Sequence, residues 1–88
     1  MNQATKWGDI SFIISSEYRK KILKNLETPK IPSKISKEID INKTHISKTL
    51  KELESKKMIK CLTPESNKGK IFVISNYGKE ILKDALKL

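Results

Sequence analysis

The first part of the chain carries apolar residues at helical spacing. They recur three or four positions apart, at Ile10, Ile13, Ile14, Tyr18, Ile22, Leu23 and Leu26. Such a repeat is typical of one buried helix face. Ser15 or Ser16 can cap the helix, with Glu17 in its first turn, where the dipole favours an anion. We predict a helix over residues 16–26, after a lead-in whose β-branched residues leave helical and extended conformations open.

A short second helix follows a proline-containing connector. Pro29 and Pro32 each bias the residue before them away from the helical region. Pro32 also suits the first position of a helix, because its missing N–H is not needed there. Ile35 and Ile39 then stand four residues apart, on one helix face. These features predict a helix over residues 32–39.

A third helix begins after a tight turn. Asp40 and Ile41 interrupt the apolar pattern, and Asn42 is a strong N-cap. The apolar pattern resumes on one face at Ile46, Leu50 and Leu53. We predict a helix over residues 43–56.

The last third of the chain predicts a hairpin and a final helix. Residues 58–63 and 70–75 are rich in β-branched and aromatic side chains, and the polar segment 64–69 separates them. Ser75 or Asn76 can cap the final helix. Its apolar residues are Tyr77, Ile81, Leu82, Ala85 and Leu86. The predicted fold class is therefore α+β but mostly helical: three helices, a β-hairpin wing and a C-terminal helix in a single domain over residues 1–88.

Composition adds a strong positive charge. The 19 Lys and Arg residues exceed the 10 Asp and Glu residues, which gives a formal net charge of +9. Residues 28–75 hold 11 of these cations and 5 of the anions, so most of the excess lies in the middle of the chain. Such a balance favours a polyanionic partner. Because all the cations except Arg19 are lysine, a lysine-rich thermophile surface is the alternative explanation.

Other compositional features exclude several classes of protein. Cys61 is the only cysteine, so neither an intrachain disulfide nor a cysteine-based zinc site can form. The longest apolar runs have four residues, as at 71–74, which is too short to span a bilayer. We expect a cytoplasmic protein that has no membrane partner.

The middle of the chain resembles a known family. The two helices around the turn at 40–42 form a helix-turn-helix, and the hairpin makes it winged. The stretch 31–54 resembles the winged-helix transcription regulators of the MarR and ArsR type, with the short archaeal ones as the nearest likeness. Shared motifs are Ser16 to Arg19, the Ser47, Leu50 and Leu53 pattern, and the basic wing Lys68-Gly69-Lys70. The resemblance covers about residues 10–85.

Two positions depart from the family pattern. Asp40 and Lys57 stand where the family usually has glycine. Asp tolerates a left-handed backbone better than most residues. Lys57 follows the helix predicted over residues 43–56, which corresponds to the recognition helix of the family, at a position where a left-handed residue commonly ends a helix. We therefore predict that Lys57 is left-handed.

The predicted DNA-binding residues lie on three elements. At 100° per residue, Thr44, Lys48, Lys51 and Ser55 face away from the core, with His45, Ser47 and Glu52 at the borders of that face. Ser33 and Lys34, at the start of a helix, can anchor a phosphate. Wing lysines can follow the flanking backbone. The complete set is Ser33, Lys34, Lys43, Thr44, His45, Ser47, Lys48, Lys51, Lys68 and Lys70.

Catalytic and metal chemistry find no support in the sequence. His45 has no Asp, Ser or Cys at a spacing that would make it a catalytic dyad. His45 and Cys61 are the only candidates for the metal pattern of ArsR-type proteins, and we expect them on a helix start and a strand. We therefore expect no enzyme activity, no metal and no cofactor, and no small-molecule effector is evident.

The sequence favours one function over two alternatives. We predict a sequence-specific double-stranded DNA-binding transcription regulator, with residues 43–56 in the major groove and the wing, 64–70, on the backbone. The alternatives are a winged-helix protein-interaction module and a sequence-neutral nucleic-acid binder. We also expect a homodimer, since the resemblance implies one and since some apolar residues exceed what a small core needs. These are Trp7, Phe12, Leu82 and Leu86.

Overall fold

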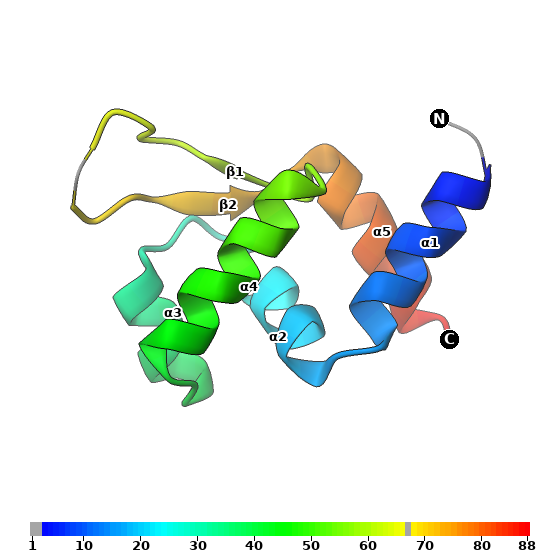
Figure 1. Cartoon of the computed structure of the whole chain (residues 1–88), viewed down its shortest axis with the longest axis horizontal. Coiled ribbons are helices and arrows are strands. Elements are labelled where there is room, and N and C mark those ends of the chain that lie inside the picture. The colour runs from blue at the N-terminus through cyan, green and yellow to red at the C-terminus, as the bar shows by residue number, and fades with distance from the viewer. Residues whose placement is uncertain (1–2, 67) are drawn as a thin grey trace.

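Five helices and a two-stranded hairpin make up the described part of the chain. The structure is a computed structural model that describes residues 3–66 and 68–88 (Figure 1). Its elements are α1 (Gln3–Ile14), α2 (Glu17–Asn25), α3 (Pro32–Ile39), α4 (Lys43–Ser55), β1 (Ile59–Cys61), β2 (Phe72–Ile74) and α5 (Asn76–Leu86). This confirms the predicted mostly helical α+β class. None of the helices described is long and apolar enough to cross a membrane.

Helix α1 resolves the conformation that the sequence left open. It is a helix of 12 residues, in spite of its β-branched isoleucines. Ile10 and Ile13 are buried, and α1 packs against α5 and α2. Tertiary burial of one apolar face therefore outweighs the weak local helix preference. The chain then turns at Ser15 and Ser16, and the Ser16 hydroxyl accepts a hydrogen bond of 3.3 Å from the Arg19 N–H, which confirms Ser16 as the cap of α2.

The helix-turn-helix forms as predicted. Pro32 begins α3, and Asp40 ends it in a left-handed conformation with φ of 53°. The Asn42 side chain caps α4 by accepting the Thr44 N–H at 2.7 Å. Helix α4 ends at Ser55, one residue before the predicted end. Lys57 follows with φ of 62°, so the predicted left-handed conformation is confirmed.

The hairpin strands are shorter than predicted. Each has three residues, with Lys60 opposite Val73 at the centre of the antiparallel register. The regular ladder ends where the Thr63 hydroxyl, instead of a backbone carbonyl, accepts the Ile71 N–H at 3.0 Å. The connector before α3 pairs with β2 in an isolated antiparallel bridge, because the Lys30 and Phe72 backbones exchange hydrogen bonds of 3.0 and 2.9 Å. The wing is thereby tied to the chain segment that leads into α3.

All five helices and both strands contribute to one core. Its fully buried large side chains are Ile13, Ile22, Leu23, Leu26, Ile35, Ile46, Leu53, Met58 and Ile81. Leu82 is only 5% exposed and belongs to this core. Phe12 is half-buried against it, with the Arg19 guanidinium 3.8 Å from its ring centroid. The prediction that Phe12 and Leu82 are apolar residues beyond the needs of the core is wrong, because both pack in or against the core of the same chain.

Candidate nucleic-acid interface

Helix α4 presents one polar face to solvent. In Figure 1 it crosses in front of α2, and its buried residues are Ile46, Thr49, Leu50 and Leu53. The opposite face is exposed and carries Lys43, Thr44, His45, Ser47, Lys48 and Lys51. All six are predicted site residues. At about 1.5 Å per residue, this 13-residue helix is about 20 Å long, and it is slim enough for a major groove about 12 Å wide.

The start of α3 has free hydrogen-bonding capacity. Its N-cap, Ile31, offers no side-chain cap, and Pro32 occupies the first position. Ser33 is half-buried and Lys34 is exposed. The amides of a helix N-terminus together with the positive end of its dipole favour an anion. Ser33 and Lys34, two of the predicted site residues, therefore lie at a helix end that favours an anion.

A groove joins α4 to the wing. It has a volume of about 300 Å³ and is lined by Pro32, Ser47, Leu50, Lys51, Glu54, Gly69, Lys70 and Phe72. Three predicted site residues from two elements, Ser47, Lys51 and Lys70, therefore meet along one groove. Buried Leu50 and Phe72 contribute apolar surface to it. Helix α4 and the wing therefore form one continuous surface.

Glu54 is a groove residue that the sequence reasoning missed. It is exposed and lines the groove together with Lys51 and Lys70. Its position three residues after Lys51 and seven after Ser47 is the signal that places it on their face. A carboxylate there repels phosphate and can accept a hydrogen bond from the cytosine amino group.

The borders of the α4 face are less free than the centre. Glu52 is bound by Arg19, with 3.3 Å between Oε2 and Nη2. The Ser55 hydroxyl donates to the Glu52 carbonyl oxygen at 2.7 Å. His45 remains exposed, and its ring centroid lies 5.5 Å from that of Tyr18 in α2. Tyr18 is thus a second residue that the sequence reasoning missed, since nothing local connects it to His45.

The wing tip depends on a glycine. Gly69 has φ of 62°, a conformation that favours glycine. Lys68 and Lys70, on either side of it, are exposed, and the Ser66 hydroxyl donates to the Lys68 carbonyl oxygen. The two wing lysines are therefore free to approach a backbone. Asn67, in the predicted tip, lies outside the described residues.

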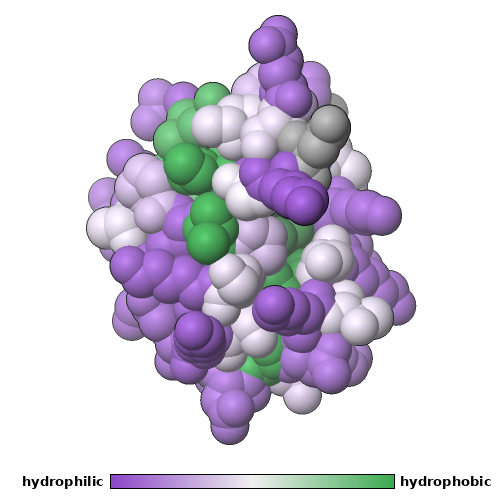
Figure 2. Space-filling view, turned by 90° about the vertical axis from the view of Figure 1, so that its left-hand side faces the viewer, coloured by the Kyte–Doolittle hydropathy of each residue, from purple (hydrophilic) through white to green (hydrophobic). Residues whose placement is uncertain are grey.

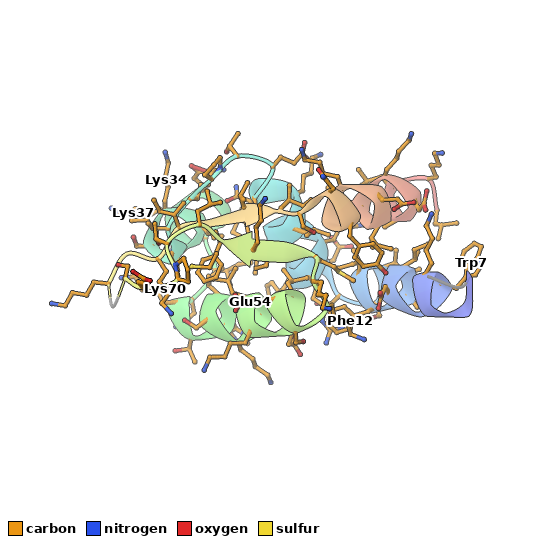
Figure 3. All side chains as sticks on the ribbon, turned by 90° about the horizontal axis from the view of Figure 1, so that it is seen from above. Trp7, Phe12, Lys34, Lys37, Glu54 and Lys70 are labelled. Carbon is orange, nitrogen blue, oxygen red and sulfur yellow. The ribbon has the colours of Figure 1, made fainter. Side chains whose placement is uncertain are left out.

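The predicted lysines form no ion pair with the acidic residues that the structure describes. Within residues 3–66 and 68–88, none of Lys34, Lys43, Lys48, Lys51, Lys68 and Lys70 lies in an ion pair. Lys30 instead binds Glu38 at 2.7 Å, and this ion pair holds the pKa of Glu38 below its usual value, with a further contribution from Asn25. Figure 3 shows Lys34, Lys37 and Lys70 at one end of the molecule and Trp7 at the other. Seen from the α3 and wing end, the surface is mostly hydrophilic (Figure 2).

Metal-binding groups do not accompany this surface. Among the described residues, no three His, Cys, Asp or Glu side chains are grouped so that they could hold a metal ion. Cys61 lies on β1 and His45 near the start of α4, as expected. The face offers hydroxyls, ammonium groups and backbone N–H groups. This chemistry binds phosphates and base edges.

Solved structures of MarR family regulators share this fold. A MarR family transcriptional regulator from Streptomyces coelicolor matches 97% of this chain with a TM-score of 0.74 and 18% identity. Wild-type MarR from E. coli in its apo form matches 94% with a TM-score of 0.76 and 17% identity. A mutant of E. coli MarR complexed with operator DNA matches 94% with a TM-score of 0.74 and 18% identity.

The likeness covers part of those proteins. The present chain spans 64% of the S. coelicolor protein and of the operator-bound E. coli mutant, and 67% of apo MarR. No protein-family model and no curated protein matches the chain. The chain has the winged helix-turn-helix fold of the MarR family transcription regulators.

Proposed function

We propose that this chain is a sequence-specific double-stranded DNA-binding transcription regulator and not an enzyme. The observation that carries the proposal is the groove that joins Ser47 and Lys51 of α4 to Lys70 of the wing. In this proposal α4 enters the major groove, while the wing and the start of α3 hold the flanking backbone. The MarR mutant of similar fold that is complexed with operator DNA supports it. The proposed setting is the cytoplasm, and the likeness to archaeal regulators stays a prediction.

The charge distribution also supports DNA as the partner. We call the exposed face of α4, which carries Lys43, Thr44, His45, Ser47, Lys48 and Lys51, the reading face. Six exposed lysines lie on it or on the elements beside it, namely Lys34, Lys43, Lys48, Lys51, Lys68 and Lys70. Each lysine that meets a phosphate releases condensed counterions, which favours binding at low salt. Short polar side chains such as Thr44 and Ser47 stand among them, where they can reach base edges. The combination of lysines that can bind phosphates and short polar groups that can bind base edges favours sequence-specific binding over purely electrostatic binding.

A selection from random duplexes tests this proposal. The chain is mixed with a pool of random duplexes at about 50 mM salt, where phosphate contacts are strong, and the bound duplexes are sequenced. We expect one motif to be enriched, and the variant Lys48→Ala/Lys51→Ala to lose that enrichment. Binding without enrichment would indicate a sequence-neutral binder. No binding to any duplex would favour the protein-interaction module.

We further propose that the chain acts as a homodimer through the end that carries Trp7. Trp7 and Leu88 are 57% and 70% exposed and line one hollow, so they replace Leu82 and Phe12 as the apolar candidates. Leu86 is also exposed, but it lines a different hollow together with Lys79 and Lys83. A hollow of about 280 Å³ between α1 and α5 adds to this face, with Trp7, Ile10 and Leu88 in its lining. Enrichment of a pseudo-palindrome would support a dimer, because operator symmetry mirrors protein symmetry. Sedimentation of Trp7→Glu beside the unchanged chain at tens of micromolar, where a dimer of roughly −6 kcal/mol is still visible, tests it directly.

A further inference from the structure

A second basic surface lies on α2 and α5. Two adjoining hollows mark it, one of about 610 Å³ whose lining includes Lys21, Lys24 and Glu27, and one of about 400 Å³ whose lining includes Glu27, Lys79 and Lys83. Since both hollows share Glu27, the four lysines stand around one continuous surface. We call Lys21, Lys24, Lys79 and Lys83 the α2–α5 lysine surface. All four side chains are exposed.

The acidic residues near this surface are largely occupied elsewhere. Glu17 binds Lys20 at 3.4 Å, Glu38 binds Lys30 at 2.7 Å, and Glu80 and Asp84 bind Lys6 at 2.9 and 3.1 Å. In the part of the chain that the structure describes, no ion pair involves any of the four lysines. Four cations therefore face solvent around Glu27 alone. Such a concentration of positive charge attracts an anionic partner.

This surface and the reading face of α4 point in different directions. Figure 1 shows α4 in front of α2, and the view from above in Figure 3 places α4 and α5 on opposite sides of the molecule. A straight duplex held by α4 therefore cannot also reach Lys79 and Lys83. DNA is stiff over about 150 base pairs, so bending it around a body with extents of 37, 26 and 19 Å is costly. A polyanion on the α2–α5 lysine surface must then be a separate molecule.

We propose that the α2–α5 lysine surface binds the phosphate backbone of a second DNA duplex, so that the chain bridges two duplexes. This inference rests on the proposed DNA-binding function. Lys79 and Lys83 lie about one helical turn apart, roughly 6 Å along the axis of α5. Two successive phosphates of one DNA strand occupy a similar length of the duplex axis, at about 3.4 Å each. The surface carries lysines as point charges and no arginine that could read a base bidentately. The second duplex is therefore held without regard to its sequence.

A capture experiment tests the bridge. A duplex selected by the chain is fixed to beads, the chain is added, and a labelled duplex of random sequence is then offered at about 50 mM salt. The test variant is Lys24→Glu/Lys83→Glu. The matched control, Lys57→Glu/Lys60→Glu, makes the same change in net charge at exposed positions after α4 and on β1. We expect the test variant to hold the fixed duplex as well as the unchanged chain does, but to capture the labelled duplex about tenfold less, while the control stays within about twofold.

The possible outcomes separate this inference from the proposed function. If the unchanged chain holds the fixed duplex and captures no labelled one, the bridge is wrong and the DNA-binding function stands. Equal capture by the test variant and the control also overturns the inference, since the two duplexes would then be held by the two α4 helices of a dimer. If the unchanged chain does not hold the fixed duplex, both proposals fail.

Discussion

The guanidinium of Arg19 in α2 binds the carboxylate of Glu52 in α4, with 3.3 Å between Nη2 and Oε2 and 3.5 Å between Nε and Oε1. The same guanidinium lies over the Phe12 ring of α1 and donates to the Phe12 carbonyl oxygen at 3.1 Å. The Arg19 side chain thus ties α4 to α2 and α1. Both charged groups are partly exposed, so solvent weakens the ion pair, and the planar stacking and the forked hydrogen bonds matter more.

Replacing Arg19 should therefore loosen α4 as well as destabilise the fold. We expect Arg19→Ala to lower the free energy of unfolding by about 1 to 2 kcal/mol, since it removes a charge-assisted hydrogen-bond fork and a cation–π contact. Arg19→Lys should restore little, because an ammonium group cannot reproduce the fork. Lys20→Ala is the control, since it breaks an ion pair between partly exposed Lys20 and exposed Glu17 and should cost less than about 0.5 kcal/mol. Urea denaturation measures all three, and equal losses in Arg19→Ala and Lys20→Ala would contradict the role assigned to Arg19.

Lys57 stores a small backbone strain that glycine should release. It is left-handed, with φ of 62°, and its side chain is exposed. We expect Lys57→Gly to raise the free energy of unfolding by up to about 1 kcal/mol, because glycine has no Cβ to clash in this conformation. Lys57→Ala removes the same charge but keeps a Cβ, so it should bring no gain. A lower thermal midpoint for Lys57→Gly than for Lys57→Ala would refute the expectation.

Local patterns predicted the boundaries of this fold better than its long-range contacts. Ser16, Pro32, Asn42 and Ser75 act within three residues of their own positions, so the helix starts could be predicted. The sequence could not decide α1, because burial against α5, more than sixty residues away, stabilises it. Periodicity likewise places Leu82 on an apolar helix face, but it does not show whether this face packs against the core of the same chain or against a second copy of the chain.

The candidate site shows the same division. The angular spacing on one helix predicted the exposed face of α4, and it would also have placed Glu54 there. The contacts of His45 with Tyr18 and of Glu52 with Arg19 join different helices, so no spacing rule on one helix predicts them. These contacts fix the borders of the exposed α4 face. Because Arg19 binds Glu52, this carboxylate is less free than the side chains at the centre of that face.

The two helical glycines should respond in opposite ways to alanine. A Cβ on Gly78 of α5 would collide with the Met58 carbonyl oxygen and would lie 2.8 Å from Ile74 Cγ1, so α5 must shift. We expect Gly78→Ala to cost about 1 to 3 kcal/mol, as overpacked positions do. A Cβ on Gly8 of α1 would meet no atom within 4 Å beyond its chain neighbours and the backbone of its own helix. Gly8→Ala should therefore gain about 0.5 to 1 kcal/mol from helix propensity. Thermal unfolding measures both variants, and a gain in Gly78→Ala would show that α5 packs differently.

Tyr77 should titrate late and make the fold sensitive to alkali. Burial raises the pKa of Tyr77 from 10.0 to about 12. The hydrogen bond that its hydroxyl donates to the Asp9 carboxylate is the second largest cause of this rise. Since the folded pKa lies above the unfolded one, this stabilisation is complete below about pH 10 and is lost as the pH rises through about 12. Ultraviolet titration of Tyr18→Phe, in which Tyr77 is the only tyrosine, should give a midpoint near the raised value. Asp9→Asn in that background should lower the midpoint, and a midpoint unchanged by it would contradict the proposed cause.

The recognition helix and the wing should fail differently when their lysines are removed. Lys68→Ala/Lys70→Ala removes charges that flank Gly69, where they can follow phosphates. This variant should weaken preferred and random duplexes alike, and flatten the salt dependence by about 0.9 log unit for each phosphate that no longer has a lysine partner. Lys48→Ala/Lys51→Ala, or Thr44→Ala, should instead narrow the difference in affinity between the preferred and random duplexes, since each bonded base edge is worth about 1 to 3 kcal/mol of discrimination.

Lys68→Ala alone is the clearer test of phosphate anchoring by the wing, because Lys70 shares the groove with Ser47 and Lys51. Binding measured over a range of salt concentrations separates the two effects, and the same weakening by both lysine pairs on every duplex would mean that α4 holds DNA without reading it.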